Sequence, residues 1–260
     1  MGCSLYDWLP IAEQLASNYT IILYHRPGYG KSELGDAPRT TEQVTKELHA
    51  LLYELAIYQP IILVGHSYGG LCAQHFAMLY PNQLQALILV DSTSMNLHRL
   101  DALDLPISDQ TDSDEIWLQK YKSYSHMDPE ALYTELQSTF INKQKQYIEF
   151  SRSPLLYKAS ASELSEWKNC ARLIQRFNVT LQIPLIIIGR DPNYSITQMI
   201  KGGMPIEEAM KLENMWQELI QEQLDLSINS KYILAKHAGH GVESERSDII
   251  IETIYSLQEI

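Results

Sequence analysis

The feature that most constrains the fold is a series of short apolar runs separated by helical patterns. Each run contains β-branched or aromatic residues and is apolar on both faces, which is typical of strands in a parallel sheet covered by helices on both sides. The runs are Thr20–Tyr24, Ile61–Val64, Leu87–Val90, Leu185–Ile188 and Tyr232–Leu234.

Amphipathic helical patterns lie between these runs. Apolar residues recur at helical spacing from Val44 to Leu55, a second helix is expected between Ser67 and Tyr80, and a third is expected after Ser247. Strands and helices that alternate at this spacing predict an α/β fold with a doubly wound, mostly parallel sheet.

The alternation is interrupted between Asp91 and about Thr180, where only helical patterns occur. These patterns cover Asp112–Tyr124, Pro129–Phe150 and Ser160–Phe177, the last opened by Ser160 and Glu163. We therefore expect a core made of residues 1–94 and 179–260, with residues 95–178 inserted as a helical cap. The aromatic residues of this cap are expected to form mainly its own core.

Composition narrows the possible partners. The chain has 260 residues, with 20 Lys and Arg against 32 Asp and Glu and a formal net charge of −12. Nucleic acid and anionic membranes both favour a basic surface, so neither is expected as a partner. The three cysteines have no metal-ligand spacing and the first residues do not resemble a signal peptide, which predicts a cytoplasmic protein without a metal.

Residues 65–70 read Gly-His-Ser-Tyr-Gly-Gly and match G-x-S-x-G between an expected strand and an expected helix. So tight a turn strains its middle residue, and small residues two positions before and after it, Gly65 and Gly69, would relieve the crowding. Ser67 would then lie exposed at the carboxyl edge of the sheet as a nucleophile. The backbone N–H of Tyr68, at the start of the helix, would face a developing oxyanion.

A serine hydroxyl is a poor nucleophile unless a base removes its proton. The candidate base is His240, which lies between the last expected strand and the last expected helix. His237 is at the strand end, where a structural role is expected. His66 is adjacent to Ser67 in sequence, so its side chain should point away from that of Ser67.

Three segments in this order give the chain a resemblance to the α/β-hydrolase superfamily over nearly its whole length. Residues 25–32, His-Arg-Pro-Gly-Tyr-Gly-Lys-Ser, resemble a family loop that usually reads D-R-P-G-x-G-x-S. Residues 62–70 resemble the nucleophile elbow, and Gly239-His240 with the acidic residues after it resembles the catalytic-histidine segment. The resemblance implies an α/β-hydrolase fold, a Ser–acid–His triad, a backbone oxyanion hole and no cofactor.

Two residues compete for the role of the acid. The family usually places it after the strand that follows the cap, in a pattern like G-x-x-D, and here Asp191 falls one residue early with Pro192 in the expected place. Asp91 ends the strand before the cap, from which some relatives draw the acid. A triad needs a carboxylate that accepts the second imidazole N–H, whichever loop supplies it. Asp91 is preferred over Asp191, and the other is expected to cap a loop or a helix.

The predicted function is a carboxylesterase-like serine hydrolase that cleaves a small ester, thioester or amide through an acyl-enzyme. A carbon–carbon hydrolase or an acyltransferase using the same triad is an alternative. A further alternative is a non-catalytic or impaired member of the family that binds a small ligand. A small molecule is the partner that all these readings share, and the sequence carries no signal for an oligomeric state.

The beginning of the chain gives one more expectation. In the family, the loop that resembles residues 26–32 follows the fourth strand, whereas here Thr20–Tyr24 is the first expected strand. We therefore expect the chain to lack the N-terminal strands, with a sheet that is gapped or rearranged beside Ile61–Val64. Met1–Ser4 matches the segment after the strand that is missing, which predicts the second oxyanion N–H at Met1. Such a short form would keep Ser67 and His240 but could lose half of its oxyanion hole.

Overall fold

The computed structural model describes residues 1–141 and 144–257, which form two compact units. The first unit comprises Met1–Thr40 and Thr111–Glu166, and the second comprises Thr41–Gln110 and Trp167–Ile260. These bounds differ from the predicted division into a core (1–94 and 179–260) and a cap (95–178), which stays a prediction.

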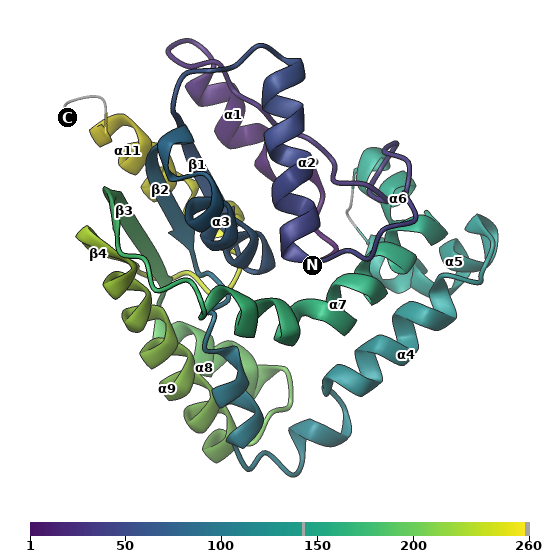
Figure 1. The fold of residues 1–260 in the computed structure, drawn as a ribbon. Coiled ribbons are helices and arrows are strands. Elements are labelled where there is room, and N and C mark those ends of the chain that lie inside the picture. Colours follow the sequence, from purple (N-terminus) through teal and green to yellow (C-terminus); the bar gives the residue numbers. More distant parts are fainter. Residues whose placement is uncertain (142–143, 258–260) are drawn as a thin grey trace. The chain divides into compact units, whose positions relative to one another are not determined.

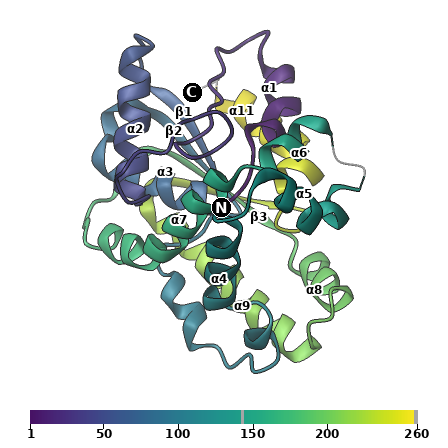
Figure 2. The ribbon, with the colours of Figure 1, turned by 90° about the vertical axis from the view of Figure 1, so that its right-hand side faces the viewer.

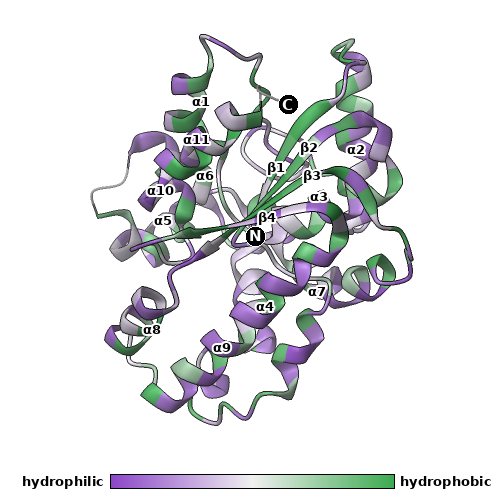
Figure 3. Ribbon diagram, turned by 90° about the vertical axis from the view of Figure 1, so that its left-hand side faces the viewer, coloured by the Kyte–Doolittle hydropathy of each residue, from purple (hydrophilic) through white to green (hydrophobic). Residues whose placement is uncertain are grey.

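A parallel sheet forms the centre of the second unit. Its described strands are β1 (Ile61–His66), β2 (Leu84–Val90), β3 (Leu181–Arg190) and β4 (Ser227–Ala235), in the order β1-β2-β3-β4. All three pairings are parallel. Leu87, Ile88 and Leu89 of β2 are fully buried, and the strands form the hydrophobic centre of Figure 3. The apolar runs that follow residue 60 are therefore confirmed as parallel strands.

Helices cover this sheet because its strands are apolar on both faces. Helix α3 packs against β1 and β2, α2 packs against α3, and α11 lies on the opposite face (Figure 3). The helices of this unit are α2 (Thr41–Glu54), α3 (Tyr68–Leu79), α8 (Pro192–Lys201), α9 (Ile206–Glu222), α10 (Val242–Glu245) and α11 (Ser247–Ser256). Short 3₁₀ turns are η2 (Pro81–Gln83), η3 (Leu97–Ala102), η4 (Ser108–Gln110) and η6 (Gln223–Leu226). The helices expected before and after β1 and at the end of the chain are confirmed.

Strand β1 lies at one edge of the described sheet, and its residues Ile61–Val64 are only partly buried. The run Thr20–Tyr24, predicted as a strand, is irregular in the structure, so this prediction is wrong. Ile21–Tyr24 are partly buried. An apolar run specifies burial, whereas a strand also needs a neighbour to pair with, and the run itself does not provide one.

The regular elements of the first unit, within its described residues, are all α-helices or 3₁₀ turns (Figures 1 and 2). Its elements are η1 (Leu5–Trp8), α1 (Leu9–Leu15), α4 (Asp114–Tyr124), α5 (Pro129–Leu136), η5 (Gln137–Phe140), α6 (Lys145–Ser151) and the first part of α7 (Pro154–Ile174). Side chains from α5, α6 and α7 form its core with Tyr29, and Tyr121 and Tyr124 of α4 pack against that core. Several aromatic residues of the predicted cap therefore do belong to a helical core.

The expected single helix Pro129–Phe150 is divided into α5 and α6. Between them the chain tightens into η5, where the Thr139 hydroxyl donates to the Leu136 carbonyl at 2.7 Å. Such local hydrogen bonds compete with the helix backbone and help to end it.

Helix α7 begins at Pro154, before the predicted start at Ser160. Glu163 is therefore inside the helix and does not cap it. Its carboxylate is fully buried and accepts hydrogen bonds from the Arg26 guanidinium at 2.9 Å and the Tyr29 hydroxyl at 2.6 Å. This contact ties the Arg-Pro-Gly-Tyr loop to α7 within the first unit.

Within residues 1–141 and 144–257, no helix is both long enough and apolar enough to cross a membrane.

Candidate active site

The turn between β1 and α3 holds Ser67 in a strained conformation, with φ 53° and ψ −127°. Its backbone N–H donates to the Val90 carbonyl at 3.2 Å, and its own carbonyl accepts from the Thr93 N–H at 3.0 Å. These bonds hold the turn against the end of β2. A side chain in such a position is fixed by the backbone around it, as in a nucleophile elbow.

Two glycines make this turn possible, but only one of them is in the predicted pair. A Cβ on Gly65 would lie 2.7 Å from the Gly69 carbonyl, and a Cβ on Gly70 would lie 2.1 Å from the Ser92 hydroxyl. A Cβ on Gly69 would meet nothing within 4 Å. The prediction that Gly69 relieves crowding is therefore wrong, because the first turn of α3 brings Gly70 against the chain that leaves β2.

Ser67, His240 and Asp91 form a continuous chain of hydrogen bonds. His240 Nε2 lies 3.0 Å from Ser67 Oγ, and His240 Nδ1 lies 2.6 Å from Asp91 Oδ2. The tautomer with its proton on Nδ1 satisfies both contacts, because Nδ1 then donates to the carboxylate and Nε2 accepts from the hydroxyl. The Asp91 side chain is fully buried, whereas the His240 side chain is 44% exposed.

Four donors surround the Asp91 carboxylate. Besides His240, these are Trp216 Nε1 at 2.8 Å from Oδ1, the Arg190 backbone N–H at 3.4 Å from Oδ1, and Arg190 Nη1 at 3.4 Å from Oδ2. Burial alone would raise the pKa of the Asp91 carboxyl, but the hydrogen bond from His240 and the Arg190 charge together lower it below its ordinary value. Asp91 is therefore an ionised acceptor at neutral pH.

Asp191 has a different environment. It is the N-cap of α8, where its carboxylate accepts from the backbone N–H groups of Asn193 and Tyr194, and it also accepts from the His237 backbone N–H at 3.0 Å. These hydrogen bonds, that from His237 foremost, lower the pKa of the Asp191 carboxyl. No hydrogen bond between Asp191 and His240 is present in the described structure. His237 itself is exposed and has a positive φ of 63°.

His66 lies behind His240. Its Nε2–H donates to the His240 carbonyl at 2.7 Å, and the two rings are 4.7 Å apart at their centroids. Burial, together with the neighbouring His240, lowers the pKa of His66 to about 4, so the ring is neutral at physiological pH. This contact fixes the backbone that carries His240.

A family model described as alpha/beta hydrolase fold matches residues 1–181. The chain belongs to this family. The predicted superfamily and fold are thereby confirmed. Ser67 and Asp91 lie within the matched residues, and His240 lies beyond them.

Similar proteins include both curated sequences and solved structures. The chain is 24% identical to an AB hydrolase superfamily protein of Gibberella zeae, over 94% of this chain and 79% of that protein. It resembles a thermophilic esterase from Thermogutta terrifontis with a TM-score of 0.64 and 20% identity, covering 97% of this chain and 84% of the other. It also resembles a putative epoxide hydrolase from Pseudomonas aeruginosa with a TM-score of 0.70 and 15% identity, covering 98% and 86%. At these identities the structures support the fold of the family.

The two predicted oxyanion donors belong to different units. Tyr68 is the first residue of α3 and directly follows Ser67, in the position where an α/β-hydrolase elbow presents a backbone N–H. Met1 belongs to the first unit, and its part in an oxyanion hole stays a prediction.

Sequence reasoning missed Trp216 and Arg190, which contact Asp91, and Glu213, which contacts Arg190. Trp216 and Glu213 lie on α9, a helix whose amphipathic pattern gives no sign that it faces the end of β2. Arg190 did offer a signal, because a charged residue at the end of a buried apolar strand needs a buried partner.

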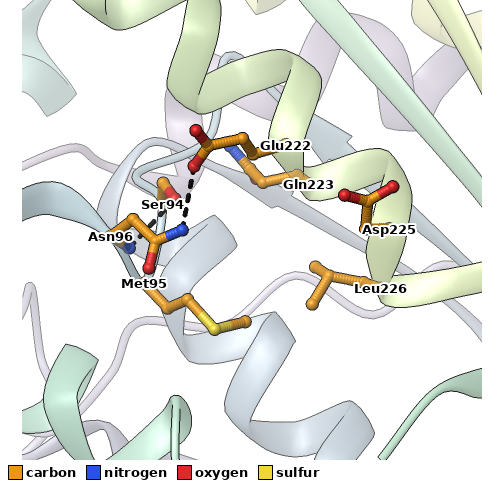
Figure 4. A pocket seen from close by; sticks show the side chains of 7 residues that line it. All are labelled: Ser94, Met95, Asn96, Glu222, Gln223, Asp225 and Leu226. Carbon is orange, nitrogen blue, oxygen red and sulfur yellow. Dashed lines mark hydrogen bonds between the residues drawn. The ribbon is translucent and has the colours of Figure 1, made fainter.

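A separate pocket of about 450 Å³ lies between the chain after β2 and the end of α9 (Figure 4). Ser67, Asp91 and His240 do not line it. Within it, the Asn96 side chain donates to Glu222 at 2.9 Å and its backbone N–H donates to Ser94 at 3.0 Å. Because these polar groups are hydrogen-bonded to one another, they do not indicate which ligand the pocket would bind.

Proposed function

We propose that the protein is a serine hydrolase that cleaves a small ester, thioester or amide through an acyl-enzyme. The observation that carries the proposal is the chain of hydrogen bonds from Ser67 through His240 to the buried Asp91. Membership of the α/β hydrolase family supports it.

In the proposed first half-reaction, Ser67 Oγ attacks the carbonyl carbon of the substrate while His240 Nε2 takes the hydroxyl proton. The ionised Asp91 stabilises the imidazolium that forms. The Tyr68 N–H stabilises the oxyanion. The tetrahedral intermediate then collapses, the bond to the leaving group breaks, and His240 returns the proton to the departing alcohol, thiol or amine.

In the second half-reaction, His240 takes a proton from water, and the resulting hydroxide attacks the acyl carbon on Ser67. The second tetrahedral intermediate expels the serine oxygen, which regains its proton from His240. The acid is released and the enzyme returns to its starting state.

Carbonyl chemistry fits this site better than epoxide opening. Attack of a serine oxygen on an epoxide would leave an ether, which His240 and water could not hydrolyse, whereas a carboxylate nucleophile leaves a cleavable ester. The elbow of this chain carries Ser67 and no carboxylate. The likeness to a putative epoxide hydrolase therefore supports the shared fold and not a shared reaction.

A fluorophosphonate probe and a panel of p-nitrophenyl esters of increasing acyl length test the proposal. The expected result is labelling of the wild type that is lost in Ser67→Ala, with ester cleavage that falls in parallel. His240→Asn should abolish labelling, while the matched control His237→Asn should retain it because the His237 side chain is exposed. Folded wild-type protein that neither labels nor cleaves any ester of the panel would refute the proposal and favour a ligand-binding role.

A further inference from the structure

Two buried charged residues next to the proposed triad, Arg190 and Glu213, have no role in the proposed reaction. Glu213 on α9 is fully buried, and the Arg190 side chain at the end of β3 is 10% exposed. Arg190 reaches two carboxylates, those of Glu213 and Asp91. The way in which this cation divides its contacts between the two anions affects how strongly the Asp91 carboxylate can stabilise a positive charge on His240.

The contacts of Arg190 are unequal. Its Nε and Nη2 donate to Glu213 at 3.0 and 2.6 Å, whereas its Nη1 lies 3.4 Å from Asp91 Oδ2. Trp216 stacks on the guanidinium, whose central carbon is 4.6 Å from the ring, while the indole N–H donates to Asp91. The guanidinium is thus held in a fork-like contact with Glu213 and is kept from a similar contact with Asp91.

Glu213 accepts hydrogen bonds from Arg190 at 3.0 Å and from the Gln217 amide at 2.8 Å. Both partners are donors, as an ionised carboxylate requires. Burial raises the pKa of the Glu213 carboxyl, and the Arg190 guanidinium opposes that rise. We call Asp91, Glu213 and Arg190 the charge cluster. With Glu213 ionised, the charge cluster carries one net negative charge. Without the Glu213 charge, it would be neutral and Arg190 would be free to pair fully with Asp91.

We propose that Glu213 is a positioning residue that restrains Arg190 and so keeps the charge of Asp91 available to His240. The inference deepens the proposed hydrolase and rests on it, because the charge is used when His240 becomes an imidazolium. The net negative charge of Asp91, Glu213 and Arg190 then stabilises the positive imidazolium, and these three side chains together with protonated His240 carry no net charge.

Other groups also face His240 and the cluster in the second unit. Ser67 and His66 approach His240 from the end of β1, and Glu243 of α10 lies 3.6 Å from His66 Nε2. Tyr232 of β4 stays neutral, because burial and the charge of Asp91 raise the pKa of its hydroxyl. Asp191 is held at the N-terminus of α8. None of these groups changes in the variants below, so they form a constant background.

The test follows the His240 imidazole resonance by NMR as pH is varied, beside the pH profile of kcat/KM on an ester. In Glu213→Gln, the titration midpoint of the ring should fall by about one pH unit, and the acid limb of the profile should move with it. Ester turnover at the plateau should fall about tenfold. In the double variant R190Q/E213Q the net charge of the cluster is restored, so both midpoints should return close to the wild type.

Glu218→Gln is the matched control, because Glu218 is an exposed residue of α9 that pairs with Arg99. It should titrate like the wild type. A folded E213Q whose midpoint does not fall, or a double variant displaced further than the single one, would overturn the inference. If E213Q does not fold, R190Q/E213Q carries the test, since its Asp91 carboxylate alone keeps one net negative charge and its midpoint must stay close to that of the wild type.

The NMR readout needs no turnover, so the two proposals fail separately. A wild type that cleaves no ester but whose His240 midpoint depends on Glu213 would refute the hydrolase and keep the charge arrangement. An active hydrolase with a midpoint indifferent to Glu213 would refute the arrangement alone.

Discussion

At the scale of single residues, Ser67 and Asp91 both hold backbone angles that L-amino acids rarely adopt, with φ of 53° and 36°. Each such angle costs on the order of 1–3 kcal/mol. The surrounding sheet ends stabilise them, since the Ser67 N–H donates to Val90 and the Asp91 N–H donates to the Ile188 carbonyl at 2.7 Å. The two side chains that contact His240 are thus positioned by the backbone before any substrate binds.

The choice between the two acids makes a direct prediction. Asp91→Asn should lower kcat on an ester by about 10⁴-fold, because an amide no longer accepts the Nδ1 proton and favours the wrong tautomer. Asp191→Asn should keep activity within about threefold, since Asn is as good an N-cap as Asp for α8. Steady-state kinetics of the two purified variants provide the comparison. Equal losses of activity in the two variants, or a loss confined to Asp191→Asn, would show that Asp91 is not the acid of the triad.

The residues of the proposed triad were not equally predictable from the sequence. Ser67 and His240 follow from local patterns, an elbow between strand and helix and a histidine after the last strand. The acid does not, because it depends on which loop reaches His240 in space. One signal favoured a capping role for Asp191, namely Pro192 after it, since Pro is common at the first position of a helix and Asp at the N-cap. The partners of Asp91 on α9 have no local signature.

At the scale of elements, the contact between the first turn of α3 and the chain after β2 depends on Gly70. Gly70→Ala should destabilise the protein by about 1–3 kcal/mol, because its Cβ would lie 2.1 Å from the Ser92 hydroxyl. Gly69→Ala should be neutral or stabilising by up to about 1 kcal/mol, since it meets no neighbour and favours the helix. Urea denaturation of both variants measures the difference. Similar losses at the two positions would contradict the packing described for this turn.

The strands after residue 60 were predictable because each contains a short run that is apolar on both faces and follows a helical pattern. The failure at Thr20–Tyr24 and the break between α5 and α6 have the same origin. Apolar content and periodicity describe what a segment buries, whereas pairing and helix ends depend on neighbours and on polar side chains such as Thr139.

At the scale of the whole molecule, the buried His66 should make stability depend on pH. The pKa of His66 is lowered to about 4 in the folded protein, below its ordinary value of 6.5. Between these values the unfolded chain binds a proton that the folded protein does not, so stability falls as pH falls through this window. The loss attributable to His66 is about 3 kcal/mol between pH 7 and pH 4.

Denaturant unfolding at several pH values, in the wild type and in His66→Gln, isolates this contribution. Glutamine keeps an N–H donor toward the His240 carbonyl but does not titrate, so the variant should lose less stability on acidification than the wild type. The other histidines with lowered pKa, His25 and His75, are common to both proteins. Parallel curves for the two proteins would contradict a buried, neutral His66.

The proposed function depends on acylation of Ser67, which mass spectrometry of the intermediate detects. After rapid mixing with a p-nitrophenyl ester and acid quenching, the peptide that contains Ser67 should carry the acyl group of the ester, and the adduct should be absent from Ser67→Ala. Ester cleavage by the wild type without an adduct on Ser67, or with an adduct on another residue, would contradict the account.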